Sequence, residues 1–204
     1  VGAANTAVRD YLLAHSGQNL RLLNTDVGGF LHALREKDFP FSQARCLVIG
    51  AGGAARAVVY GLLAEGAAVT IVNRTLSRAQ ALCTDMQKMV EGAEVEAYEL
   101  PASKEAAHII LQNMTKDEGG YPELVVQTTQ IGMEPDIDKD PLPAWEFTGN
   151  ELVYDIIYTP ECTRFLQRAS AVGCQVISGK AMFQGQADLQ SQRFLAALAG
   201  KQKS

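Results

Sequence analysis

The chain has 204 residues, of which 47% are hydrophobic and 20% are charged, so it can bury the core of one large domain or of a domain with a small appendage. Its formal net charge of −5 at pH 7 argues against nucleic acid or an anionic membrane surface as the main partner. No apolar run approaches the ~20 residues that span a bilayer, and no secretory signal is recognisable.

The cysteines and histidines are dispersed, without the spacing that metal ligands show. Cys46 lies within an apolar run, where a buried and inert thiol is the expected state. We therefore expect no metal site and a reducing compartment.

The first predicted elements are two short extended stretches within residues 1–24, the second at Leu20–Leu23. An amphipathic helix is predicted at Gly28–Lys37, because its apolar side chains follow helical spacing. Asp26 stands just before this helix, where a carboxylate can accept hydrogen bonds from free backbone N–H groups. The sequence therefore predicts that Asp26 caps the helix.

Strands and helices alternate from Arg45 to the end of the chain. Strands are predicted at Arg45–Ile49, Ala68–Val72, Val95–Tyr98, Leu124–Thr128, Leu152–Ile156 and Gln175–Ile177. Helices are predicted at Ala54–Ala64, Thr75–Glu91, Lys104–Met114, Thr163–Val172 and Met182–Ala199. This alternation is typical of an α/β fold with a doubly wound, Rossmann-like parallel sheet and helices on both faces.

A glycine-rich turn joins the first of these strands to its helix. Residues Gly50 to Ala55 fit the pattern G-x-G-x-x-A, in which the first glycine allows the tight turn and the second lets backbone approach a pyrophosphate. The start of the next helix offers free N–H groups and the positive end of its dipole to phosphates. A plain strand-to-helix turn is the alternative, but the buried strand before it and the strand after its helix favour a dinucleotide site.

The end of the second strand indicates which dinucleotide is bound. A site for NAD places an acidic residue there to hold the ribose hydroxyl, whereas this chain has Asn73-Arg74-Thr75, with Arg78 one helical turn further. Two guanidinium groups can bind a 2′-phosphate with paired hydrogen bonds. They can also be read as solvated side chains, although cations at a helix start are unfavourable without an anion. The pattern favours NADP.

Taken in order, the motifs resemble those of the shikimate dehydrogenase family. That family pairs a G-A-G-G-A turn with an N-R-T-x-x-R/K segment, as Gly50–Ala54 and Asn73–Arg78 do. Its patterns G-A-x-N-T, N-T-D, A-T-x-x-G-M, Y-D-x-x-Y and G-x-x-M-x-x-x-Q-A correspond, in the same order, to Gly2–Thr6, Asn24–Asp26, Thr128–Met133, Tyr154–Tyr158 and Gly179–Ala187, with Thr128 in place of the alanine.

The resemblance implies the NADPH-dependent reduction of 3-dehydroshikimate to shikimate, and the reverse reaction. It implies that Asp26 is catalytic, and that the substrate contacts Asn5, Asp26, Tyr158 and Gln186. It implies that NADP contacts Gly50, Ala51, Gly52, Gly53, Ala54, Asn73, Arg74, Thr75, Arg78, Thr128, Ile156, Gly179 and Met182. From the residues alone, Thr128 ends a strand at the ligand-binding edge, and Asp26 can equally be a helix cap, the two roles being compatible.

Two departures from the family pattern bear on activity. The family carries a catalytic lysine and a Ser-x-Ser carboxylate clamp in a domain before G-A-x-N-T, where this chain begins, and it often has Asn where this chain has Gln127. The resemblance therefore implies a remnant of the substrate domain at residues 1–24, an NADP-binding domain at 25–178 and a C-terminal helix toward the substrate side at 179–204. It implies a chain that binds NADP but needs the N-terminal domain, fused or associated, for turnover.

Residues Ser178–Phe183 also resemble the form of the enzyme that is fused behind a dehydroquinate dehydratase. The family implies a cytoplasmic protein, or a plastid one if the chain comes from such a fusion. Three alternatives remain open: a quinate/shikimate dehydrogenase, a glutamyl-tRNA reductase-like NADP domain, and a non-catalytic NADP-binding module. The second would not explain Asn24-Thr25-Asp26 or Gln186.

Overall fold

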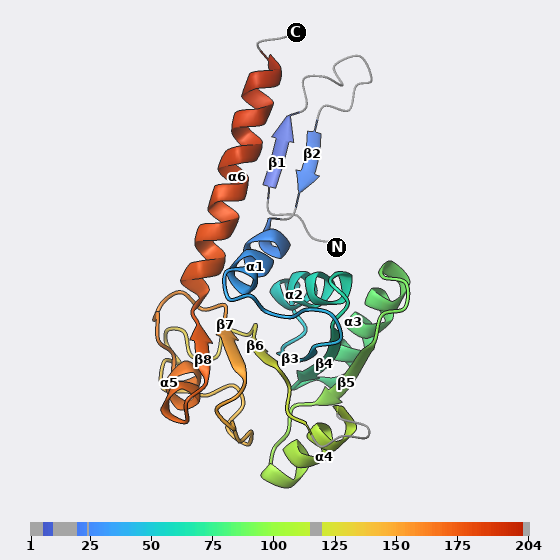
Figure 1. Cartoon of the computed structure of the whole chain (residues 1–204), viewed down its shortest axis with the longest axis vertical. Coiled ribbons are helices and arrows are strands. Elements are labelled where there is room, and N and C mark those ends of the chain that lie inside the picture. Colours follow the sequence, from blue (N-terminus) through green and yellow to red (C-terminus); the bar gives the residue numbers. More distant parts are fainter. Residues whose placement is uncertain (1–5, 10–19, 24, 115–119, 202–204) are drawn as a thin grey trace.

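The computed structural model describes residues 6–9, 20–23, 25–114 and 120–201. Its centre is a six-stranded parallel sheet with the strand order β5-β4-β3-β6-β7-β8 (Figure 1). The strands are β3 (Arg45–Ile49), β4 (Ala68–Asn73), β5 (Val95–Glu99), β6 (Leu124–Gln127), β7 (Leu152–Asp155) and β8 (Gln175–Ile177). This is the strand order of the Rossmann fold, in which two βαβαβ halves meet at the point where the order reverses, here between β3 and β6. The predicted doubly wound fold is therefore confirmed.

Each predicted strand forms, and its ends differ from the prediction by at most one residue. The strands are easy to recognise because helices cover both faces of the sheet, so that every residue of β6 and β7 is buried. The last residues of these two strands are nevertheless polar, Gln127 and Asp155. Both are completely inaccessible to solvent.

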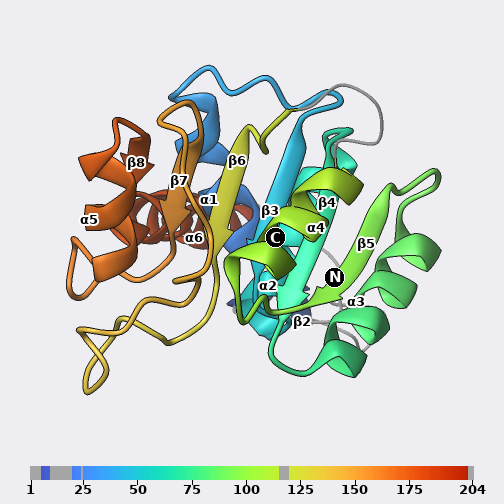
Figure 2. The ribbon, with the colours of Figure 1, turned by 90° about the horizontal axis from the view of Figure 1, so that it is seen from below.

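The helices form a layer on each face of the sheet (Figure 2). One core lies under α1 (Asp26–Arg35), α2 (Gly53–Ala64) and α3 (Leu76–Met89). The other core lies under α4 (Lys104–Met114) and α5 (Arg164–Ala171). The ring of Phe30 on α1 stacks on that of Tyr154 on β7, with centroids 5.1 Å apart. Full burial of such a side chain contributes about 1.5–3 kcal/mol, so this contact holds α1 on the sheet.

Helix α1 begins two residues earlier than the sequence predicts. Asp26 is its first residue and Thr25 occupies the cap position, so the prediction that Asp26 caps the helix is wrong. Its carboxylate still lies in the first turn, at the positive end of the helix dipole. The sequence does not predict the early start because Gly28 and Gly29 have low intrinsic helix propensity. Packing against another helix stabilises the helical conformation of these residues.

That partner is α6 (Gly179–Lys201), which begins three residues before the predicted Met182. A Cβ atom added at Gly29 would lie 2.7 Å from both Gln186 N and Met182 O, and one at Gly185 would lie 3.1 Å from Gly29 Cα. No side chain fits between the two backbones there. We call this region, formed by Gly29, Met182, Gly185 and Gln186, the α1–α6 contact.

Helix α6 continues beyond the sheet and runs beside β1 (Thr6–Arg9) (Figure 1). Strand β1 pairs with β2 (Leu20–Leu23) in an antiparallel register, which confirms the second predicted extended stretch. In the ranges that the structure describes, no helix is both long enough and apolar enough to cross a membrane.

Candidate functional site

An open cleft of about 610 Å³ lies at the carboxyl ends of the central strands. It occupies the place where the strand order reverses, between β3 and β6, which is where open α/β sheets bind ligands. The walls come from the glycine turn, the end of β4, the first turn of α3 and the loops after β6 and β7. They consist of Gly50, Ala51, Gly52, Gly53, Ala54, Asn73, Arg78, Thr128, Thr129, Gln130, Met133, Ile156, Ile157 and Tyr158.

The glycine turn has the geometry that its sequence predicts. Gly50 has a φ of +111°, and a Cβ atom there would lie 2.6 Å from Thr128 Oγ1. Thr128 Oγ1 donates a hydrogen bond of 2.6 Å to the carbonyl of Ile49. Added Cβ atoms at Gly52 or Gly53 would meet no other atom within 4 Å, so the turn borders open space. The free N–H groups at the start of α2 can therefore accommodate an anion.

The end of β4 leads directly into α3 beside this turn. Asn73 Nδ2 donates a hydrogen bond of 2.8 Å to the carbonyl of Thr75, the residue at the cap position of α3. Arg78 lines the cleft, whereas Arg74 and Thr75 are exposed and do not line it. Among the described residues, neither Arg74 nor Arg78 forms an ion pair with a carboxylate. A phosphate group beside Asn73 would be within the field of two cations.

The loop after β7 begins at a buried carboxylate. Asp155 accepts hydrogen bonds from Ile157 N at 2.9 Å and from Thr163 Oγ1 at 2.7 Å. Burial raises the pKa of Asp155 to about 6, and the charge of Asp140 adds to this rise, while the two hydrogen bonds oppose it. The side chain thus holds the backbone of a segment that lines the cleft.

The predicted substrate residues lie on elements that touch one another. Asp26 is half-buried in the first turn of α1, and Gln186 is half-buried on α6 at the α1–α6 contact. Tyr158 lines the cleft, is 59% exposed, and stacks on Phe183 of α6 with centroids 5.5 Å apart. Asn5 lies outside the described residues.

Besides Arg74 and Thr75, two more predicted cofactor contacts, Gly179 and Met182, are not among the wall residues. Gly179 N donates to the carbonyl of Ile157 at 3.1 Å, and a Cβ atom at Gly179 would lie 2.0 Å from Ile156 O. Gly179 therefore supports wall residues through close backbone packing. Met182 is 7% exposed and belongs to the core. The contacts of both residues with a cofactor stay predictions.

Four wall residues had no individual prediction: Thr129, Gln130, Met133 and Ile157. Their signals in the sequence are the motif segments Thr128–Met133 and Tyr154–Tyr158, which contain them, and their place after the ends of β6 and β7. The carboxyl ends of neighbouring parallel strands form one edge, so the residues that follow them border the same crevice.

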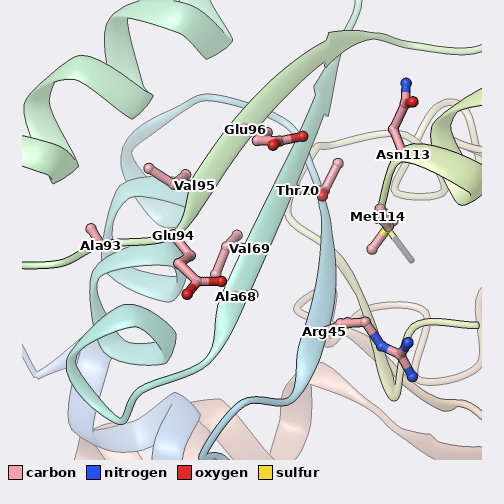
Figure 3. Close-up of a pocket in the computed structure, with 10 residues that line it drawn as sticks. All are labelled: Arg45, Ala68, Val69, Thr70, Ala93, Glu94, Val95, Glu96, Asn113 and Met114. Carbon is pink, nitrogen blue, oxygen red and sulfur yellow. The ribbon is translucent and has the colours of Figure 1, made fainter. Parts of the chain in front are cut away.

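A second pocket, of about 430 Å³, lies near the amino ends of β3, β4 and β5 (Figure 3). Glu94 and Glu96 lie on one side of it, and Arg45 and Asn113 lie on the other. The guanidinium group of Arg45 already forms an ion pair of 2.7 Å with Glu123. Because this pocket is far from the glycine turn and the strand-order reversal, we assign the ligand site to the carboxyl edge. In the described ranges, no cluster of three His, Cys, Asp or Glu side chains could hold a metal ion.

Sequence comparison identifies relatives of this chain. The family model described as "Shikimate / quinate 5-dehydrogenase" matches residues 33–118. The protein named shikimate dehydrogenase (NADP(+)) of Salinibacter ruber is 40% identical over 192 residues, which are 92% of this chain and 61% of that protein. The corresponding protein of Carboxydothermus hydrogenoformans is 36% identical, and 58% of its length is covered. The chain thus spans about three-fifths of the length of these curated relatives.

Solved structures share the fold. Shikimate 5-dehydrogenase from Thermus thermophilus, in complex with NADP(H) and shikimate, is 31% identical, with a TM-score of 0.70 over 98% of this chain and 69% of that one. Quinate dehydrogenase from Corynebacterium glutamicum, in complex with NAD, is 27% identical, with a TM-score of 0.76 over 95% of this chain and 62% of that one.

Proposed function

Because this chain belongs to the shikimate dehydrogenase family, we propose that it is the cofactor-binding part of an NADP-dependent enzyme that interconverts 3-dehydroshikimate and shikimate. The observation that carries the proposal is the shared cleft, in which the glycine turn at Gly50 and the guanidinium-bearing start of α3 at Arg78 line one continuous wall. Three of the most similar relatives are named NADP(+)-dependent shikimate dehydrogenases.

We place the cofactor along this cleft by its chemistry. The pyrophosphate lies at the glycine turn and the start of α2, where backbone N–H groups are free to bind it. The 2′-phosphate lies beside Asn73, Arg74 and Arg78, and the absence of an acid at Asn73 removes the repulsion that would exclude it. The nicotinamide extends toward the loop after β7, on the other half of the sheet, where Ile156 and Tyr158 line the cleft.

On the substrate side, the protein's own groups orient the substrate and handle the proton. When bound, the nicotinamide supplies or accepts the hydride. We propose that Asp26 holds the reacting hydroxyl and helps to move its proton, and that Tyr158 and Gln186 contact the substrate. These three residues come from α1, the loop after β7 and α6, and α6 contacts the other two elements. Their relative positions therefore depend on the α1–α6 contact.

We further propose that a lysine and a carboxylate clamp come from a segment that the relatives have and this chain does not span, either fused to it or associated with it. The chain alone should then bind NADP but oxidise shikimate slowly or not at all. A quinate dehydrogenase is the second candidate function, because one of the similar solved structures bears that name.

The proposal is tested by assaying this chain alone and together with the N-terminal part of a relative, using shikimate and quinate with NADP. We expect negligible turnover by the chain alone, and turnover that favours shikimate once the second part is supplied. Faster oxidation of quinate would support the second candidate. Substantial shikimate oxidation by the chain alone would contradict the proposed division of the active site.

A further inference from the structure

Two buried polar side chains stand side by side at the ligand-binding edge of the sheet. Gln127 ends β6 and Asp155 ends β7, and the two residues are partners in the parallel register of these strands. Both side chains are polar, whereas the other residues of the two strands are mainly apolar, and both are completely inaccessible to solvent. Burying an amide or a carboxylate is unfavourable unless hydrogen bonds compensate for the lost water. The partners of these groups are therefore informative.

Gln127 uses both ends of its side-chain amide on the loop that follows it. Its oxygen accepts a hydrogen bond of 2.6 Å from Thr129 N, and its nitrogen donates to Thr129 O at 3.2 Å and to Ile131 O at 2.8 Å. The hydroxyl of Thr129 in turn accepts a hydrogen bond from Ile131 N. One side chain thus fixes the backbone of the loop that carries the wall residues Thr128, Thr129 and Gln130.

Asp155 does the same for the loop after β7. One carboxylate oxygen accepts from Ile157 N, and the other accepts from the hydroxyl of Thr163. Thr163 Oγ1 also accepts a hydrogen bond from Leu166 N, which caps α5. The carboxylate therefore joins the end of β7, a wall segment of the cleft and the start of a helix.

The two loops are also in contact with each other. Ile156 N donates to the carbonyl of Gln127 at 3.1 Å. Gly132 has a φ of +102°, and a Cβ atom there would lie 3.5 Å from Thr163 Cβ and 3.6 Å from Ile157 Cδ1. The walls that follow β6 and β7 therefore form one connected unit, and its shape is set from inside the protein.

We propose that Gln127 and Asp155 are positioning residues of the cofactor cleft: each ends a strand, binds the loop that follows, and fixes one wall against which the dinucleotide lies. This inference rests on the proposed binding of NADP. Neither side chain is required to touch the cofactor. Without either side chain, the loop that it binds has more conformations in the folded protein. Binding of the dinucleotide must then order this loop, which weakens the affinity.

The test is a titration of the chain and its variants with NADPH, with the melting temperature measured for each. Gln127→Met keeps the length of the side chain, Asp155→Leu keeps its branching, and both remove its hydrogen bonds. We expect each to weaken NADPH binding by about tenfold or more, since Gln127 loses three hydrogen bonds and Asp155 loses two. Asp155→Asn keeps an oxygen that accepts from Ile157 N, and should bind NADPH within about threefold of the unaltered chain.

The matched control is Glu151→Gln. Glu151 is also buried and also holds a loop, since it accepts hydrogen bonds from Thr148 N and Gly149 N, but it lies at the amino end of β7. We expect this variant to lose stability without losing affinity for NADPH. If it weakens NADPH binding as much as Gln127→Met and Asp155→Leu do, the effect comes from lost stability and the proposal is overturned.

A fragment of the cofactor separates this inference from the proposed function. Adenosine 2′,5′-bisphosphate should occupy the end of the cleft near β4, away from the loop that Asp155 holds. Asp155→Leu should therefore bind it as the unaltered chain does, and an equal loss for fragment and NADPH would overturn the positioning role. If the unaltered chain binds neither compound, the proposed function itself fails.

If an apolar variant does not melt cooperatively, Gln127→Glu decides the question. This change keeps the shape and the acceptor for Thr129 N, but it places a carboxylate against the carbonyls of Thr129 and Ile131. We expect weaker NADPH binding, by about tenfold, from a protein that still folds. Unchanged NADPH affinity in this variant would overturn the proposal.

Discussion

The two sides of the proposed active site are constructed in opposite ways. The part that would hold the adenosine half of the cofactor comes from one continuous stretch, Arg45 to Arg78, which folds as strand, turn, helix, strand and the first turn of α3. The substrate side combines Asp26 near the start of the chain, Tyr158 after β7 and Gln186 near its end. The helices of Asp26 and Gln186 meet at the α1–α6 contact, and Tyr158 stacks on Phe183 of α6. Neighbours in sequence build the first region, and neighbours in space build the second.

This difference decides what a change in each region should do. In the adenosine half, the turn and strand ends are set by the sheet itself, so substitutions there should alter ligand binding more than folding. On the substrate side, residues with no ligand contact fix the distance between two helices. Substitutions at the α1–α6 contact should therefore alter folding first.

The largest effect should follow Gly29→Ala. The added Cβ atom would lie 2.7 Å from two backbone atoms of α6, which cannot move aside as a side chain can. Overpacking of this kind costs about 3 kcal/mol, and the better helix propensity of alanine offsets at most ~1 kcal/mol of it. Chemical denaturation would measure the fall in the free energy of unfolding.

The neighbouring Gly28→Ala is the matched control for that change. Its Cβ atom would meet only the end of the Leu189 side chain, which can adopt another rotamer. We expect the free energy of unfolding to change by less than about 1 kcal/mol, because the gain in helix propensity offsets the adjustment. Equal losses for the two variants would show that α1 and α6 are not in backbone contact.

The next effect concerns the pH dependence of stability through Asp155, in the loop after β7. Its pKa is raised to about 6 in the folded protein, above the usual 3.8 that applies when the chain is unfolded. Between these two pH values the folded state holds more protons, so stability falls as pH rises from about 4 to 6. The nearby Asp140 adds to this effect although it pairs with Arg168 at 2.7 Å.

Comparison with Asp155→Asn isolates this contribution, because asparagine does not titrate. Each pKa unit corresponds to about 1.4 kcal/mol. From pH 4 to pH 7, the free energy of unfolding of the variant should therefore rise, relative to that of the unaltered chain, by up to about 3 kcal/mol. Denaturation curves of both proteins across this range are the measurement. Parallel pH profiles would mean that the carboxylate is not buried as the structure shows.

The smallest effect should be confined to ligand binding. Arg78→Ala removes a cation from the cleft wall without removing packing, because Arg78 is exposed. We expect the affinity for NADPH to fall by about tenfold, or about 1.4 kcal/mol, and the affinity for NADH to change little. Arg35→Ala, which removes the same charge from α1, serves as the control and should leave both affinities unchanged. An equal loss of affinity for NADPH and NADH would show that Arg78 does not bind the 2′-phosphate.

Most of the fold is predictable from the sequence because its signals are local. Runs such as Cys46–Ile49 are apolar on both faces, and Gly50 and Gly66 interrupt them at the turns. The helix starts are less predictable. Glycines at 28, 29 and 179 lower the intrinsic helix propensity, and only contact with a distant segment explains why these residues are helical or directly begin a helix.

The candidate site divides in the same way. The turn at Gly50 to Ala54 and the residue Arg78 were predicted from spacing, and they line the cleft. The sequence contains no sign that Gln127 would turn its amide onto its own loop, because a polar residue at a strand end is equally compatible with exposure to solvent. The backbone groups that satisfy it become visible only once the loop is folded.

The most direct measurement of the central claim is a calorimetric titration of this chain with NADPH, NADH and shikimate. The cleft predicts one NADPH site for each chain, binding of NADH weaker by more than about tenfold, and little heat from shikimate alone. NADPH should also raise the melting temperature, because it binds only the folded state. Equal affinity for the two cofactors, or no binding of NADPH, would contradict the assignment of this cleft to NADP.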